Sequence, residues 1–260
     1  MGVKSFKVFV SVLVFGVVLS ASSTAYADNL AITSFSVNNL QFTSATGTAQ
    51  FTLTGTTARA AASNTFGENI DNLSNTFPIA QSTATVTFAS ANGIANATTN
   101  SLSGSASVNI GDCSCSANSF TITTFTGTLV ILGTEGTVDV NISALTSQLR
   151  QVQTDQFGIR AQSEILFDLF VNGSPVFSFQ IDLLSPIDGP NGLTFIQGSG
   201  QLNGTVRLQA GVANTISARL TTGSIAVSEV PEPATVVMLV SGLGFMTGVL
   251  KKRAKKADRK

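Results

Sequence analysis

The sequence offers few side chains that are suited to catalysis. Its 260 residues include no histidine and no tryptophan. Without histidine the chain cannot build a Ser-His-Asp or Cys-His catalytic arrangement, a histidine-ligated zinc site or a facial-triad iron site. The chemistry that remains open depends on two cysteines, a small number of carboxylates and many hydroxyl groups.

The two cysteines, Cys113 and Cys115, are separated only by Ser114. Outside the cytoplasm a pair of cysteines favours a disulfide. One intervening residue places the two Cα atoms near the upper distance limit unless the chain turns, which the neighbouring pairs Gly111-Asp112 and Ala117-Asn118 allow. Two thiolates with no histidine make only half of a zinc site. We therefore expect a structural disulfide, with free thiols, cross-linking to a partner, and a redox or metal role as the alternatives.

Glu164 and Asp168 are a carboxylate pair of the kind that a glycan hydrolase needs. On a β-strand they share one face but lie about 13 Å apart, which is wide even for an inverting glycosidase. A solvated strand face is the better interpretation. The stretch 188–192, Asp-Gly-Pro-Asn-Gly, has oxygens for calcium but lacks the alternating spacing of an EF-hand loop. We expect a tight turn there, and no metal or cofactor.

Threonines separated by one residue form a third candidate, because a flat hydroxyl array would suit an ice or sugar surface. The sets do not recur at one period, so we expect them on the solvent faces of ordinary strands. They are Thr52 and Thr54, then Thr83, Thr85 and Thr87, then Thr121 and Thr123.

The elements that position these groups are predicted to be β-strands. Period-two alternation recurs through residues 28–229, while long helical periodicity is nearly absent. Segments 49–54, 83–88, 120–123 and 138–143 each place apolar residues on one face and threonine or other polar residues on the other. The pattern predicts an all-β fold, an antiparallel β-sandwich or a similar architecture.

A hairpin within 159–184 is the clearest local prediction. Two apolar sets, 165/167/169/171 and 177/179/181/183, flank Asn172-Gly173-Ser174-Pro175. Both sets must face the same side, so partner numbers should sum to an even value. Pairing Val171 with Phe177, Leu169 with Phe179 and Phe167 with Ile181 satisfies this condition.

Later strands are expected near 202–208 and 215–227, with a helical turn over 58–62 and a polar loop over 68–74.

The amino terminus has the order of a secretory signal peptide. Lys4 and Lys7 precede the apolar run 8–19, and Ala25-Tyr26-Ala27 follows as an A-x-A cleavage box. Cleavage after Ala27 would leave Asp28 as the first residue of the mature chain. An uncleaved membrane anchor is the alternative.

The carboxyl terminus has three distinct parts. Val230-Pro231-Glu232-Pro233 precedes seventeen uncharged residues, 234–250, and the tail 251–260 carries seven basic residues. Seventeen residues of helix cover about 25 Å, the short end of a bilayer span. The basic tail would stay in the cytoplasm by the positive-inside rule, and the prolines would stop the helix from continuing outward.

These three parts in this order resemble the PEP-CTERM sorting signal of bacterial surface proteins. The resemblance covers residues 230–256 and implies recognition by an exosortase, a membrane-embedded cysteine transpeptidase. Such an enzyme would cut near Pro231-Glu232-Pro233 and pass the chain to the cell surface or the extracellular polymer matrix. A tail of this kind also carries the label of an ice-binding protein C-terminal domain, which says nothing about the residues before it. The alternative is a plain tail anchor that is never cut.

The charge distribution excludes one class of partner. Residues 28–229 contain five arginines and twelve acidic residues, a net charge of −7, and no lysine lies between residues 8 and 250. A segment of this charge repels phosphate backbones, so we expect no nucleic-acid partner. The predicted organisation is a signal peptide over 1–27, an extracytoplasmic β-rich domain over 28–229 and the sorting signal over 230–260.

The function predicted from these features is that of an exported bacterial surface or extracellular-matrix protein with a structural or adhesive role, not an enzyme. Its partners would be an exosortase-type protease, the inner membrane through the C-terminal helix, and extracellular polysaccharide. A carbohydrate- or ice-binding module is the first alternative, and a carboxylate-based glycan hydrolase is the second. Two carboxyls about 5–10 Å apart in a groove would favour the hydrolase, and a flat threonine face would favour ice binding.

Overall fold

The computed structural model describes residues 29–110, 113–154, 158–184 and 192–228. The described residues form β-strands joined by short turns, and none of them is helical. The strands are β1 (Asn29–Ser44), β2 (Thr48–Asn64), β3 (Asn69–Ser74), β4 (Ile79–Val86), β5 (Ala89–Asn96), β6 (Ser101–Ile110), β7 (Cys115–Leu132), β8 (Thr137–Thr154), β9 (Gly158–Val171), β10 (Ser174–Leu184), β11 (Gly192–Gln209) and β12 (Asn214–Ser228).

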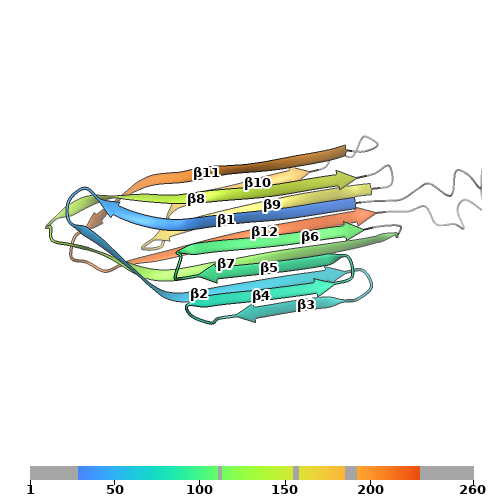
Figure 1. The fold of residues 1–260 in the computed structure, drawn as a ribbon, viewed down its shortest axis with the longest axis horizontal. Helices are drawn as coiled ribbons and strands as arrows, with labels where there is room; N and C mark the ends of the chain where they lie inside the picture. Colours follow the sequence, from blue (N-terminus) through green and yellow to red (C-terminus); the bar gives the residue numbers. More distant parts are fainter. Residues whose placement is uncertain (1–28, 111–112, 155–157, 185–191, 229–260) are drawn as a thin grey trace, which may run out of the picture.

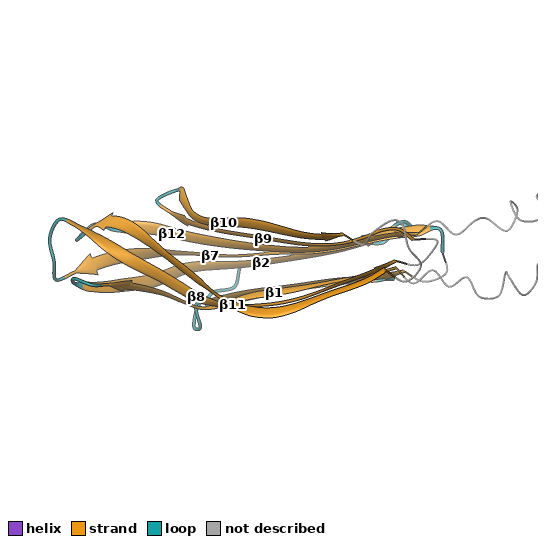
Figure 2. Cartoon of the chain, turned by 90° about the horizontal axis from the view of Figure 1, so that it is seen from above, coloured by secondary structure: helices purple, strands orange, loops and turns teal. Residues whose placement is uncertain are grey.

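These strands form two six-stranded sheets that face each other as two layers (Figures 1 and 2). Sheet A has the order β11-β8-β1-β6-β5-β4, and sheet B has the order β10-β9-β12-β7-β2-β3. Every paired neighbour is antiparallel. The prediction of an all-β, antiparallel two-sheet architecture is therefore confirmed.

The sandwich is long and narrow because its strands are long. β7, β8 and β11 each have 18 residues, which corresponds to about 60 Å at the usual strand rise. β1 begins and β12 ends at the same end of the sandwich (Figure 1), and this end, marked by Asn29 and Ser228, is called the base. The opposite end, the tip, holds the connections 45–47, 133–136 and 210–213.

The predicted hairpin is present, but its register differs by two residues. Val171 pairs with Ser174, and Leu169 pairs with Phe177 instead of Phe179. Asn172 and Gly173 both have positive φ, 51° and 78°, as a two-residue type I′ turn requires. With this turn alone the numbers of paired residues would sum to an odd value. A bulge at Val176 restores the even sum that keeps both apolar sets on one side. The apolar sets therefore still share one side, as the pattern predicted.

Two predictions for the first third of the chain are wrong. Residues 58–62 lie in β2 and not in a helical turn, and most of the expected loop 68–74 is the edge strand β3. Ala58, Ala60 and Ala62 are fully buried between the sheets. Alanine is used here because little space separates the layers, so tertiary packing overrides its helix propensity.

The core changes composition along the sandwich. Toward the tip it is apolar and aromatic, with Phe125, Phe167 and Leu129 buried among other large side chains. At the base it contains mainly alanines, together with Val108 and Ile110. The large side chains and the alanines are separated by a zone of buried hydroxyl groups.

This zone, the hydroxyl seam, joins the two sheets with hydrogen bonds. It comprises Thr33, Ser119, Thr121, Ser163, Thr222 and Ser224, all buried. Thr33 Oγ1 on β1 lies 2.6 Å from the carbonyl oxygen of Gly223 and 2.7 Å from Ser163 Oγ, both in sheet B. In the other direction, Ser224 Oγ donates to the Ala106 carbonyl at 2.9 Å and Ser119 Oγ donates to the Ser107 carbonyl at 3.1 Å.

The seam reverses the orientation that was expected for segment 120–123. Thr121 and Thr123 face the core and are fully buried, while Phe120 and Ile122 face outward. Thr121 Oγ1 lies 2.8 Å from Thr222 Oγ1 on the neighbouring strand. The layers approach too closely here for a phenylalanine. The Thr121 hydroxyl is buried with a partner, whereas Thr123 Oγ1 is buried with none among the described residues.

We predict that Gly104→Ala destabilises the fold by about 1–3 kcal/mol, the usual range for overpacking a tight core. A Cβ at Gly104 on β6 would overlap the hydroxyl of Thr121 and lie 2.8 Å from that of Thr222. The matched control is Gly198→Ala on β11, where the nearest atom, Gln148 Nε2, is 3.8 Å away. Urea unfolding measures both variants, and equal free energies of unfolding would contradict the close approach of the sheets.

Candidate functional site

Glu164 and Asp168 lie on the outer face of β9 with Leu166 and Phe170, as the alternation predicted. Each carboxylate has its own partner on β10. Gln180 Nε2 donates to Glu164 Oε1 at 3.0 Å, and Ser178 Oγ donates to Asp168 Oδ1 at 2.7 Å. Four residues of strand separate them by about 13 Å along the chain. The fold therefore does not bring them together as an acid–base pair.

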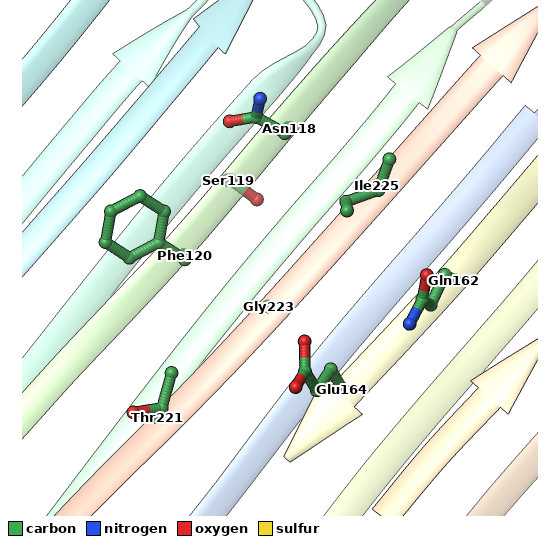
Figure 3. A pocket seen from close by; sticks show the side chains of 8 residues that line it. All are labelled: Asn118, Ser119, Phe120, Gln162, Glu164, Thr221, Gly223 and Ile225. Carbon is green, nitrogen blue, oxygen red and sulfur yellow. The ribbon is translucent and has the colours of Figure 1, made fainter. Parts of the chain in front are cut away.

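Sheet B has a hollow on its outer surface where Gly223 lacks a side chain (Figure 3). The volume of the hollow is about 330 Å³, and its walls include Phe120, Gln162, Glu164 and Thr221. The guanidinium carbon of Arg59 lies 5.4 Å from the centre of the Phe120 ring. Glu164 is the one carboxylate among the residues that line this hollow. An aromatic ring beside amide and carboxylate groups can hold a polar ligand. The residues that line the hollow do not, however, provide the second carboxylate that a glycosidase needs.

The outer surface of sheet A is almost free of charge. Among the described residues it bears Asp139 and Arg207, which form an ion pair at 3.3 Å near the tip. The outer surface of sheet B differs sharply. Its charged residues are Arg59, Asp71, Arg160, Glu164, Asp168, Asp182 and Arg219.

Strand pairing arranges the polar side chains of sheet A into rows. In one row, Ser199, Ser147, Ser36 and Ser103 are successive partners on β11, β8, β1 and β6. The next row toward the base contains Gln197, Leu149, Ser34, Ser105, Asn92 and Thr83. The side chains of these two rows, completed by Ile94 and Gln81 in the first, are called the neutral face.

The spacing within the neutral face is regular. Neighbouring strands lie about 4.8 Å apart, and successive rows lie about 6.8 Å apart along the strands. Ser36 Oγ and Ser147 Oγ approach to 2.8 Å, so the hydroxyls also interact across strands. The result is a regular array of neutral side chains, most of them hydrogen-bond donors or acceptors, with Leu149 and Ile94 as its apolar members.

Sequence reasoning missed the neutral face because its members are far apart in the chain. The threonine sets that were considered do not converge on one surface. Thr83 and Thr85 are exposed on β4 of sheet A, Thr52 and Thr54 are exposed on β2 of sheet B, and Thr121 is buried. The alternating serines at 101, 103, 105 and 107 in β6 were the one local signal for it.

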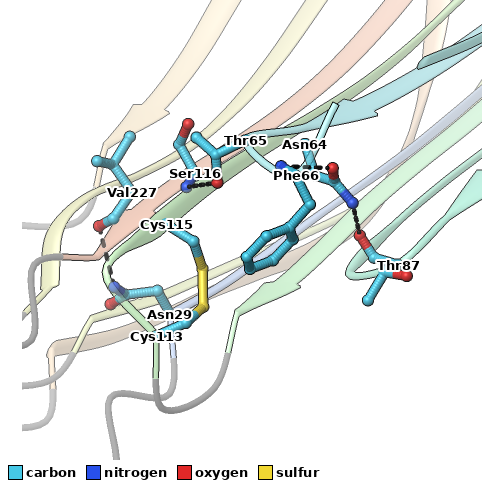
Figure 4. The surroundings of a disulfide bond; sticks show 9 residues. All are labelled: Asn29, Asn64, Thr65, Phe66, Thr87, Cys113, Cys115, Ser116 and Val227. Carbon is cyan, nitrogen blue, oxygen red and sulfur yellow. Dashed lines mark hydrogen bonds between the residues drawn. A yellow bond between two sulfur atoms is a disulfide. The ribbon is translucent and has the colours of Figure 1, made fainter. Parts of the chain in front are cut away.

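Cys113 and Cys115 are joined by a disulfide at the base (Figure 4). Their Cα atoms are 5.3 Å apart, within the ordinary range for such bonds and not at its upper limit. Cys115 starts β7 and packs into the alanine-rich part of the core. With both sulfurs bonded, neither cysteine offers a thiolate to a metal or a substrate.

A narrow cleft opens between the sheets along β10 and β11. Its volume is about 230 Å³, and Phe35, Gln148, Phe179 and Leu202 contribute to its walls. Two residues from Gln148 along β8, the side chain of Arg150 is buried with 4% exposed. Among the described residues, neither Nε nor Nη1 of Arg150 has a hydrogen-bond partner. Burial lowers the pKa of this guanidinium, and the charge of Asp182 opposes the shift.

Several predicted site residues lie outside the described residues. They are Ala25 and Ala27 of the cleavage box, Val230, Pro231, Glu232 and Pro233 of the sorting motif, the span 234–250, the tail 251–260 and the turn at 188–191. The described part of the chain contains no helix long and apolar enough to cross a membrane. It also contains no cluster of three or more histidine, cysteine, aspartate or glutamate side chains placed to hold a metal ion.

Comparison with known proteins adds no identity to this geometry: no family model, no curated protein and no solved structure matches the chain.

We predict that Arg150→Met raises the free energy of unfolding by about 1–3 kcal/mol, because it removes a buried charge that no carboxylate of the described residues bonds. The control is Arg219→Met, at an exposed position on the outer surface of sheet B, where we expect a change within about 0.5 kcal/mol. Chemical denaturation measures both variants. A loss of stability in Arg150→Met alone would mean that the guanidinium has a partner in solution.

Proposed function

We propose that this chain is an exported bacterial surface or extracellular-matrix protein, held in the inner membrane by its C-terminal tail and then released by an exosortase-type protease. The observation that carries the proposal is the order of the tail: Val230-Pro231-Glu232-Pro233, seventeen uncharged residues and a basic end. The signal-peptide pattern of residues 1–27 supports the same route.

The arrangement of the base is compatible with this route. Asn29 Nδ2, at the start of β1, donates to the Val227 carbonyl near the end of β12 at 3.0 Å. Both ends of the described chain are therefore held at the base, away from the tip. β12 ends at Ser228, before the motif begins. Cleavage near 231–233 would leave every described strand intact.

The neutral face supports an adhesive role over a catalytic one. Neutral hydroxyls and amides can exchange hydrogen bonds with a polyhydroxylated polymer without attracting or repelling charge. A second candidate, a carbohydrate-binding module for neutral polysaccharide, is favoured by the serine row across β11, β8, β1 and β6. Ice binding gains less support, because the ordered hydroxyls are serines and Thr121 and Thr123 are buried.

We predict that replacing Pro231-Glu232-Pro233 with three alanines traps the full-length precursor in the membrane of the producing cell. The prolines would keep this junction extended and free of helix, a form that a protease can bind. Replacing Val236-Val237-Met238 with alanines is the control, because it retains both the motif and an uncharged span. Mass spectrometry of the surface fraction is the measurement. Wild-type protein that still carries Lys260 at the surface would establish the plain tail anchor instead.

The adhesive role is tested with Ser103→Lys in the neutral face. We expect the wild-type protein to sediment with cellulose but not with alginate beads. We expect Ser103→Lys to bind cellulose at least tenfold more weakly, because an ammonium group buried or crowded at the contact with the polymer loses solvation. Ser217→Lys on the outer surface of β12 makes the same substitution in sheet B and should bind like the wild type. Equal losses in both variants, or no cellulose binding by the wild type, would refute this role.

A further inference from the structure

Three of the four sheet edges have features that discourage further strand pairing. On one side of the sandwich, β3 and β4 are joined by side chains: Asn72 Nδ2 donates to the Thr83 carbonyl at 2.6 Å, and Ser82 Oγ donates to the Asn72 carbonyl at 2.7 Å. On the other side, β10 contains Pro175, which has no N–H, and the bulge at Val176. Proline and bulges are the usual devices that keep an edge from pairing with another chain.

The fourth edge, β11, has none of these devices. It pairs with β8 without a register shift over all 18 residues and contains no proline. In an antiparallel ladder about half of its residues direct both N–H and C=O toward the free side. Leu193 and Phe195 are 56% and 50% exposed beside this edge, on the outer surface.

The charge of β11 favours a second copy of the same chain as the partner. Its one charged side chain, Arg207, is already paired with Asp139 on β8. Two β11 edges would therefore meet without net repulsion. An antiparallel strand edge is also self-complementary, so a two-fold axis satisfies both copies with the same residues.

We propose that β11 pairs antiparallel with β11 of a second copy, so that two copies of sheet A form one continuous sheet. A register in which partner numbers sum to an even value keeps the two neutral faces on the same side. The dimer would then present a neutral face of twice the width. Leu193 and Phe195 would gain neighbours from the other copy.

Because of the direction of the strands, this pairing depends on release of the chain from the membrane, and this step rests on the proposed function. Antiparallel β11 strands place the two bases at opposite ends of the dimer. Two copies held in one membrane by their tails have their bases on the same side. If both copies stand with their long axes normal to the membrane, they cannot form this dimer until the tail is removed.

The test uses the full chain in detergent micelles, where no shared bilayer fixes the direction of the copies. Sedimentation velocity should show a concentration-dependent dimer for the wild type. Gln201→Lys, exposed near the middle of β11, should weaken dimerisation at least tenfold, because in the register of fullest overlap it places two ammonium groups near the two-fold axis. Gln81→Lys makes the same substitution at an exposed position on the closed edge β4 and should match the wild type.

Cross-linking tests the same contact independently. Both native cysteines are bonded to each other, so Gln201→Cys and Gln81→Cys each introduce one free thiol. A flexible bis-maleimide should link two copies through Gln201→Cys and not through Gln81→Cys. A monomeric wild type, equal behaviour of the two lysine variants, or equal cross-linking would overturn the proposal. Because no cleavage occurs in the micelle, these results are independent of whether an exosortase processes the tail.

Discussion

The close approach of the two sheets in the middle and at the base of the sandwich is the constraint on which the rest of the structure depends. Thr33 reaches the Gly223 carbonyl across the gap at 2.6 Å, a distance that leaves no room for large side chains nearby. Gly104, the buried alanines of β2 and the inward threonines of β7 all follow from it. Hydrogen bonds between hydroxyls and backbone carbonyls replace apolar burial there, since a buried polar group without a partner costs about 1–3 kcal/mol.

The same close packing organises the base, where the chain enters and leaves the described sandwich. The bond from Asn29 to Val227 connects sheet A to sheet B at this end, and the Cys113–Cys115 disulfide lies beside it (Figure 4). These contacts lie outside the sorting motif. The proposed processing would therefore change where the protein is held without changing how it is folded.

The composition of the outer surfaces follows from which residues the core buries. Once the small or apolar residue of each alternating pair is buried, the other must face solvent. In sheet A the outward set is mainly serine, asparagine, glutamine and threonine, with exposed apolar residues such as Leu145, Leu193 and Phe195 among them and almost no charge. Charged residues are concentrated on the outer surface of sheet B, where they favour contact with water. The long free edge β11 borders the neutral face, so dimerisation through that edge and adhesion through that face would reinforce each other.

Period-two alternation by itself determined the all-β class, and it also placed the inward residues Val138, Val140 and Ile142 and the hairpin of Ile165 and Phe167. The composition of the two termini determined the export and sorting predictions, because those signals are read as linear sequence. Only the tertiary structure decided that Thr121 points inward and Phe120 outward, since the alternation is the same for either face and the gap between sheets selects the smaller side chain. Strand order alone aligned Ser36, Ser103, Ser147 and Ser199, because residues so far apart in the chain become neighbours through pairing that no local pattern contains.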